Sequence, residues 1–161
     1  MKIALAGAGA FGEKHLDALK QIDGVEVVSV VGARLEPTQA VAEKYSISHA
    51  TTELAETLEL PGLDAVILAT PTQLHAAQAI QCLEAGKHVQ VEIPLCDSLA
   101  DGEAVLAKQQ ETGLVAMVGH TRRFNPSHQY LHRKIAAGEL AVQQMDVQTY
   151  FFRRKNINAK G

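Results

Sequence analysis

Short apolar segments alternate along the chain with longer segments in which apolar residues recur at helical spacing. The short segments predict β-strands at residues 2–6, 25–31, 48–51, 64–69, 88–91 and 115–118. The longer segments predict a helix that contains residues 11–22 and further helices at residues 37–45, 52–58, 73–85, 97–112 and 125–137. This alternation is typical of the α/β fold class, with a doubly wound parallel sheet and helices on both faces.

Several helix boundaries carry their own signals. Asp97 or Ser98 is a suitable N-cap for the helix at 97–112, and Asn125 followed by Pro126 opens the last helix. Glycine is the expected stop of three helices, at Gly86, Gly113 and Gly138. In the first helix, four apolar residues are spaced so that they share one face: Phe11, Leu16, Leu19 and Ile22.

Residues 141–151 show partial alternation of apolar and polar side chains, as in an antiparallel strand with one solvated face. A single strand leaves backbone groups unpaired, so this segment predicts the first strand of a second, truncated α+β domain. We therefore expect the parallel-sheet domain at 1–124, and a linking helix with the start of the second domain at 125–161.

Composition excludes several classes of partner. The 161 residues are 47% apolar and carry a net charge of −3, with mostly scattered basic residues, so neither nucleic acid nor an anionic membrane is expected to bind. The apolar runs are too short to span a membrane, and no signal-peptide pattern precedes the first strand, which predicts a cytoplasmic protein. Cys82 and Cys96 lack metal-type spacing and are expected to be reduced thiols.

The most informative motif follows the first strand directly. Gly7, Gly9 and Gly12, with Ala10 and Phe11 among the intervening residues, have the spacing of a dinucleotide-phosphate turn of the Rossmann type. Such glycines allow a sharp turn, a close approach of pyrophosphate and tight packing of the next helix, whose N-terminus attracts the anion. The alternative is a plain tight turn. The preceding strand and the following helix favour a nicotinamide cofactor.

The end of the second strand bears on which cofactor binds. An NAD site usually has an acidic residue there to bind both ribose hydroxyls, whereas this chain has Gly32, Ala33 and Arg34, and its next acid is Glu36. The guanidinium of Arg34 suits a 2′-phosphate. We therefore expect NADP, with NAD as the alternative if Arg34 is only a solvated loop residue.

Ligands of open α/β sheets bind outside the carboxyl ends of the strands. After the fourth strand, Thr70, Pro71, Thr72 and His75 are expected to line the cofactor site, although His75 also fits a purely packing role. After the fifth strand, Glu92 is expected to accept hydrogen bonds from the nicotinamide ribose. The alternative for Glu92 is an ion pair that ties it to the scaffold.

The loop after the sixth strand is rich in cations. Arg122 and Arg123 suit a small-molecule substrate that bears carboxylates, and Arg122 is also a candidate cofactor contact. An internal ion pair is the alternative role for each. His120 is a candidate catalytic base from its position at a strand end. Arg153 and Arg154 are further candidate substrate residues.

The glycine turn, Ala-Thr-Pro-Thr-Gln-Leu-His at 69–75, Glu-Ile-Pro at 92–94 and Arg-Arg-Phe-Asn-Pro at 122–126 occur in this order. Together they resemble the glucose-fructose oxidoreductase, inositol dehydrogenase and MocA family. The resemblance implies a Rossmann domain, then an α/β domain whose open sheet mediates homo-oligomer contacts and supplies much of the substrate pocket. It also implies that the glycines hold pyrophosphate, that Thr70, Pro71 and His75 line the cofactor loop, and that Glu92 binds the nicotinamide ribose.

One residue departs from the family pattern. The family usually has Glu-Lys-Pro, whose lysine commonly assists proton transfer, and this chain has Ile93 in place of the lysine. We therefore expect the main base to be a histidine outside these 161 residues, with His120 as the second candidate. The expected activity is NADP-dependent oxidation of a CH–OH group, which these 161 residues alone are not expected to complete. The alternatives are a sugar or inositol dehydrogenase and a non-catalytic dinucleotide-binding module.

Overall fold

The computed structural model describes residues 1–148 and 150, and its main feature is one sheet of six parallel strands. The strands are β1 (Lys2–Ala6), β2 (Glu26–Val31), β3 (His49–Thr51), β4 (Ala65–Leu68), β5 (His88–Val91) and β6 (Ala116–Val118). Their order in the sheet is β3-β2-β1-β4-β5-β6, and every neighbouring pair is parallel. This is the doubly wound Rossmann order, as the sequence predicts.

Helices follow the strands in alternation. They are α1 (Ala10–Leu19), α2 (Leu35–Tyr45), α3 (Leu54–Leu58), α4 (Thr72–Glu84), α5 (Leu99–Thr112) and α6 (Pro126–Ala136). Each predicted helix is present, and the boundaries differ from the predicted ones by a few residues at most. Helix α1 ends before residue 22, to which the first helix was expected to extend. A short 3-10 helix, η1 (Thr121–Phe124), was not predicted.

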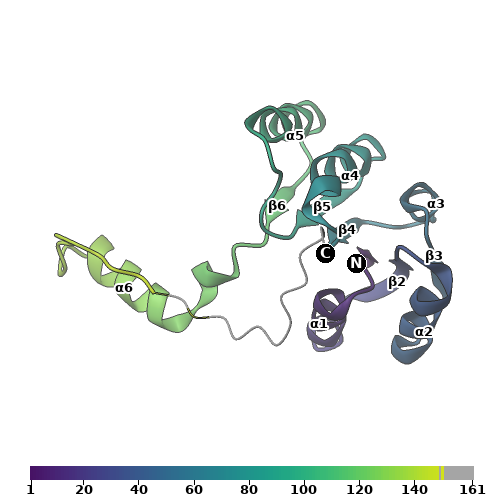
Figure 1. Cartoon of the computed structure of the whole chain (residues 1–161), viewed down its shortest axis with the longest axis horizontal. Coiled ribbons are helices and arrows are strands. Elements are labelled where there is room, and N and C mark those ends of the chain that lie inside the picture. The colour runs from purple at the N-terminus through teal and green to yellow at the C-terminus, as the bar shows by residue number, and fades with distance from the viewer. Residues whose placement is uncertain (149, 151–161) are drawn as a thin grey trace, which may run out of the picture. The chain divides into compact units, whose positions relative to one another are not determined.

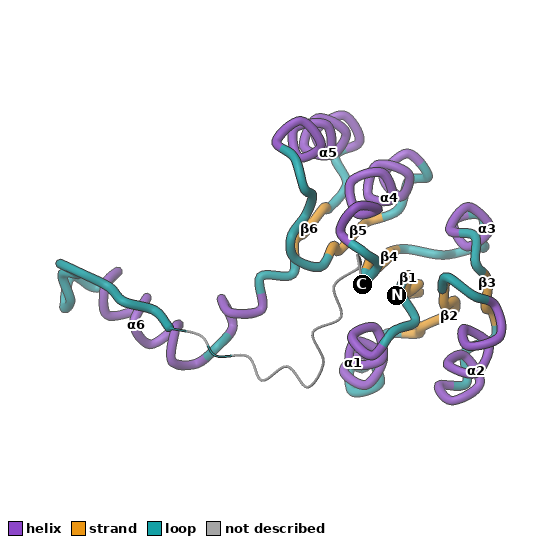
Figure 2. The backbone as a smooth tube through the Cα atoms, viewed as in Figure 1, coloured by secondary structure: helices purple, strands orange, loops and turns teal. Residues whose placement is uncertain are grey.

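Helices cover both faces of the sheet (Figure 1), and the strands lie between two layers of helix (Figure 2). Because side chains alternate along a strand, each strand contributes to two cores. Ala4, Ala6, Val66 and Leu68 pack with α3, α4 and α5. Ile3, Leu5, Val30 and Ile67 pack with α1 and α2. The alternation along β1 and β4 thus fixes which helices lie on which face.

The predicted helix boundary signals are present. The Ser98 hydroxyl accepts a hydrogen bond from the backbone N–H of Asp101 at 3.1 Å, so Ser98 rather than Asp97 caps α5. The Asn125 side chain caps α6 by accepting from the N–H of Ser127 at 3.0 Å. The three predicted stop glycines all have positive φ, between 67° and 74°.

Two expectations were wrong. Helix α1 ends at Leu19, so Ile22 lies in the turn to β2, and Ile22 and Phe11 are both 52% exposed rather than buried with Leu16 and Leu19. The strand expected at 141–151 does not form at residues 141–148 and 150, and residues 149 and 151 lie outside the described part. A strand needs a neighbour to pair its backbone groups, and the described residues supply none there.

The chain divides into two compact units between His120 and Thr121. The first contains the whole sheet with α1 to α5, and the second contains η1 and α6. Within the residues that the structure describes, no helix has the length and apolar character needed to cross a membrane.

Candidate functional site

The glycine turn between β1 and α1 has no room for side chains at two positions. Gly7 has φ of +111°, and a Cβ there would lie 2.3 Å from the carbonyl oxygen of Ala69. A Cβ at Gly12 would lie 1.8 Å from the carbonyl oxygen of Gly7. Gly7 therefore allows the turn, and Gly12 lets α1 pack against it.

Gly9 is different, because a Cβ there would have nothing within 4 Å. It is the N-cap of α1 and makes no side-chain capping bond, and the first N–H groups of the helix, from Ala10 onward, have no carbonyl partner within the helix. Backbone N–H groups and the positive end of the helix dipole favour an anion at this position. The turn therefore fits the pyrophosphate of a dinucleotide.

A cleft of about 500 Å³ opens beside the glycine turn. Its walls include Gly7 and Gly9 from this turn, Arg34 and Thr52 from the ends of β2 and β3, and Thr70 and Pro71 from the loop after β4. Five predicted cofactor residues thus share one cleft. Arg34 carries the one charged side chain among the described residues that line it.

The segment after β2, residues 32–34, determines the charge of this part of the cleft. A Cβ at Gly32 would lie 2.0 Å from Oγ1 of Thr38, so the chain approaches α2 closely there. The Thr38 hydroxyl donates to the carbonyl oxygen of Arg34 at 2.6 Å, which fixes the backbone at the start of α2. The Arg34 side chain is exposed, and Gly32, Ala33 and Arg34 bring no carboxylate to the cleft.

The loop after β4 is held from inside. The Thr70 hydroxyl donates to Oε1 of Gln78 at 2.6 Å. His75 is 1% exposed, with Nε2 lying 2.7 Å from the carbonyl oxygen of Thr70 and Nδ1 lying 2.8 Å from that of Pro94. His75 therefore joins two strand-end loops, and its direct contact with a cofactor stays a prediction. Thr72 is the first residue of α4.

Glu92 is buried at the end of β5 with 8% exposure. Its Oε1 lies 2.9 Å from Nε2 of His15 on α1, and this histidine was not predicted as a site residue. The Phe11 ring meets the His15 ring edge-on at 5.7 Å between centroids. A Cβ at Gly119 would lie 3.1 Å from Oε1 of Glu92, so that glycine leaves room for the carboxylate.

Ile93 and Pro94 follow Glu92 in the Glu-Ile-Pro segment. Ile93 is 47% exposed, and its peptide bond to Pro94 is cis.

At the end of the first unit, His120 is exposed, and its backbone N–H donates to the carbonyl oxygen of Val118 at 2.8 Å. The role of His120 as a base stays a prediction.

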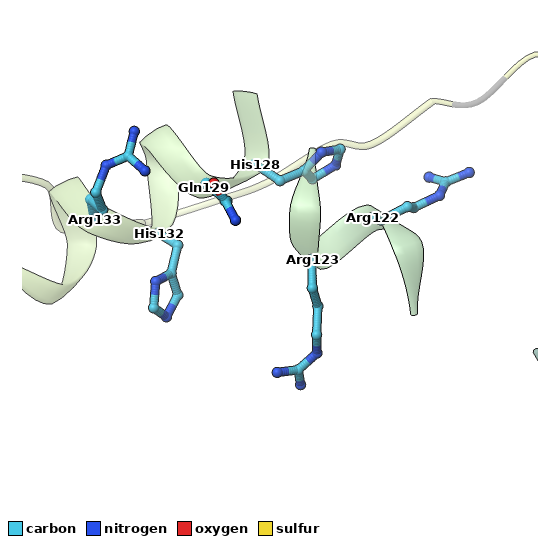
Figure 3. Close-up of a pocket in the computed structure, with 6 residues that line it drawn as sticks. All are labelled: Arg122, Arg123, His128, Gln129, His132 and Arg133. Carbon is cyan, nitrogen blue, oxygen red and sulfur yellow. The ribbon is translucent and has the colours of Figure 1, made fainter. Parts of the chain in front are cut away.

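The second unit holds the predicted substrate arginines that the structure describes. Arg122 and Arg123 lie on η1 and border a hollow of about 650 Å³ with His128, Gln129, His132 and Arg133. In Figure 3, Arg123 and His132 extend to the same side, whereas Arg122 and Arg133 point in other directions. The hollow is rich in cationic groups, which suits an anionic ligand. Arg153 and Arg154 lie outside the described residues.

Both cysteines are free thiols. Cys82 is fully buried in the core, and burial raises the pKa of its thiol to about 12. Cys96 is half-buried, and its thiol donates to the carbonyl oxygen of Ser98 at 3.2 Å. Across residues 1–148 and 150, no group of three or more His, Cys, Asp or Glu side chains is placed to hold a metal ion.

Sequence comparison finds close relatives. The chain is 71% identical over all its 161 residues to the 4-carboxy-2-hydroxymuconate-6-semialdehyde dehydrogenase of Sphingobium sp. strain SYK-6, and it covers 51% of that protein. It is 36% identical over 141 residues to the scyllo-inositol 2-dehydrogenase (NAD(+)) of Bacillus subtilis, with 87% of this chain and 41% of that protein covered. The chain thus spans about half the length of the curated relatives it matches.

Solved structures and family models agree with this similarity. A probable dehydrogenase from Thermotoga maritima superposes with a TM-score of 0.82 at 28% identity, over 86% of this chain and 41% of that one. Residues 126–161 match the C-terminal model of bacterial oxidoreductases. Residues 1–120 match the model of the oxidoreductase family with an NAD-binding Rossmann fold. The chain therefore belongs to the glucose-fructose oxidoreductase, inositol dehydrogenase and MocA family of NAD-binding oxidoreductases.

Proposed function

We propose that this chain is the cofactor-binding part of an NADP-dependent dehydrogenase that oxidises 4-carboxy-2-hydroxymuconate-6-semialdehyde. The observation that carries the cofactor proposal is the glycine turn, where Gly9 borders open space in a cleft whose walls include Arg34. The substrate proposal rests on the 71% identity to the Sphingobium enzyme of that name.

Arg34 supports NADP over NAD. Its guanidinium lies in the wall of the cleft, and Gly32 and Ala33 before it bring no carboxylate that would repel a phosphate. Arginine binds phosphate through paired N–H groups, which makes it well suited to a 2′-phosphate on the adenosine ribose. The pyrophosphate would lie on the glycine turn, and Glu92 would accept hydrogen bonds from the nicotinamide ribose.

The proposed substrate reacts as its cyclic hemiacetal, and the product is 2-pyrone-4,6-dicarboxylate. When bound, the nicotinamide ring would supply the hydride acceptor for this oxidation at the hemiacetal carbon. The hemiacetal O–H must give its proton to a base, and Ile93 has no group that accepts one. That base is a histidine outside these 161 residues or, as the second candidate, His120.

Arginines suit the carboxylates of this substrate. Arg122 and Arg123 are described on η1, and Arg153 and Arg154 are assigned the same role from the sequence alone. Paired N–H groups on arginine match a carboxylate geometrically and electrostatically. We further propose that the complete enzyme is a cytoplasmic homo-oligomer, as its sequence leads us to expect.

A second candidate is a sugar or inositol dehydrogenase, which the 36% identity to the Bacillus subtilis inositol enzyme favours. Two features weigh against it. Ile93 replaces the lysine that the family usually has, and the arginines near η1 suit an anionic substrate better than a neutral polyol. A substrate screen on the complete enzyme separates the two, because only one of them turns over inositols or sugars.

The cofactor proposal is tested by titrating the chain with NADPH and with NADH, followed by nicotinamide fluorescence or calorimetry. We expect tighter binding of NADPH, and we expect Arg34→Ala to remove that preference while NADH binding changes little. Arg34→Lys, which keeps the charge but not the paired N–H groups, is the matched variant and should retain part of the preference. Failure of the chain to bind either cofactor would refute the proposal.

A further inference from the structure

We propose that His15 is a positioning residue for Glu92, and that it presents the carboxylate to the nicotinamide ribose. This inference rests on the proposed function, because it takes Glu92 as the residue that meets this ribose. It concerns a contact between residues 77 positions apart in the chain, which connects α1 to the end of β5.

The chemistry of the contact fixes its direction. An ionised carboxylate can only accept hydrogen bonds, so the proton between the two groups belongs to Nε2 of His15. This bond of 2.9 Å engages Oε1 of Glu92. It leaves Oε2 as the oxygen that accepts from a ribose hydroxyl, and it defines the rotation of the carboxylate about its last bond.

Burial makes the contact necessary. Glu92 is 8% exposed, and a carboxylate withdrawn from water is unfavourable unless another group stabilises it. His15 is half-buried, with 18% of its side chain exposed. The Phe11 ring borders His15, and the missing side chain at Gly119 leaves room beside Oε1. The ring contact thus supports His15, and the glycine gives the carboxylate the space it needs beside this histidine.

The His15–Glu92 pair also connects the proposed pyrophosphate site at the glycine turn with the proposed ribose site at Glu92. Helix α1 begins at Ala10, where its N–H groups would meet the expected pyrophosphate, and His15 follows in the second turn of the same helix. Phe11 and His15 lie four residues apart, on the same side of the helix. The helix that receives the phosphates thus also orients the carboxylate for the ribose at the other end of the dinucleotide.

The test compares ligands that contain the nicotinamide nucleoside with ligands that lack it. NADPH is paired with 2′,5′-ADP and NADH with ADP, because the shorter ligands cannot reach Glu92. We expect His15→Ala to weaken NADPH and NADH binding about tenfold while the affinity for 2′,5′-ADP and ADP stays unchanged. His15→Gln, whose side-chain amide can donate from a similar place, should restore most of the lost affinity.

A double-mutant cycle adds a second readout. If His15 acts through Glu92, then His15→Ala should have little further effect on NADPH affinity in a chain that already carries Glu92→Gln. The inference would be overturned if His15→Ala weakened the binding of NADPH and of 2′,5′-ADP equally. It would also be overturned if the effects of His15→Ala and Glu92→Gln on NADPH affinity simply added. In either case the role of His15 would be structural. Failure of the unsubstituted chain to bind any of the four ligands would instead refute the proposed function.

Discussion

The Nε2 atom of His75 lies 2.7 Å from the carbonyl oxygen of Thr70, which ties the first turn of α4 to the loop that precedes it. The other ring nitrogen, Nδ1, lies 2.8 Å from the carbonyl oxygen of Pro94. One buried ring therefore connects the loops that follow β4 and β5. A histidine in this place therefore holds the loop at Thr70 and Pro71, which forms part of the wall of the cleft.

We expect His75→Leu to lower the free energy of unfolding by about 1–3 kcal/mol, because leucine fills a similar volume but cannot donate the ring's hydrogen bond to a backbone carbonyl oxygen. Urea unfolding measures this change. His132→Leu on α6 replaces an exposed histidine and should change stability by less than about 0.5 kcal/mol. Equal stability of the His75→Leu and unsubstituted chains would show that hydrogen bonding by this ring does not contribute to stability.

Two glycines of one motif should respond differently to alanine. Gly12→Ala places a Cβ against the Gly7 carbonyl oxygen and should destabilise the fold by about 3 kcal/mol or more. Gly9→Ala meets no neighbour and should leave the melting temperature unchanged, yet weaken NADPH binding at least about tenfold because the methyl group occupies ligand space. Unchanged NADPH affinity in Gly9→Ala would contradict a pyrophosphate at this turn.

Cofactor preference should shift when a carboxylate is added at the end of β2. Ala33 is exposed and borders the cleft beside Arg34, so Ala33→Asp should keep the fold while repelling a 2′-phosphate. NADPH affinity should fall about tenfold, and NADH affinity should fall less or rise. Ala33→Asn has the same size without the charge and serves as the control. A similar loss of NADPH binding in both variants would indicate a steric cause.

Cys82 should make stability depend on pH in alkaline solution. Burial raises the pKa of this thiol from 9.0 to about 12. Below pH 9 the thiol is protonated in both states, and between pH 9 and about 12 it ionises first in the unfolded chain, so its contribution to stability is lost as the pH rises. Unfolding in urea on either side of pH 9 should show this loss. Cys82→Ala, which lacks the thiol, should show a shallower decline.

Periodicity sufficed to predict all six strands and their parallel arrangement, because a buried parallel strand such as residues 64–69 is a short apolar run bounded by turns. It was less reliable at the ends of elements. Ile22 has the right spacing for the buried face of α1, but the helix stops three residues earlier. At residues 141–148, strand formation depends on a partner, which alternation in one segment cannot supply.

In the candidate site, too, local features could be predicted from the sequence, whereas contacts between distant residues could not. Glycine spacing located the turn at Gly7 and Gly9 because the requirement is local in the chain. The role of His75 between two loops and the pairing of His15 with Glu92 depend on contacts across the sheet. One signal for His15 was present, since it follows Phe11 by four residues on the helix of the glycine turn. Only the structure supplies its partner.

The close approach of Gly12 to Gly7 has a consequence for how such a scaffold can diversify. Substitution of Gly7 or Gly12 disturbs the backbone itself, so a lineage that keeps the fold must keep these two glycines. Ala33 and Arg34 are exposed, and exchanges there affect stability little. Under the proposed function, exchanges in this short exposed segment can change which dinucleotide is preferred, while the two glycines that shape the turn stay fixed by the fold.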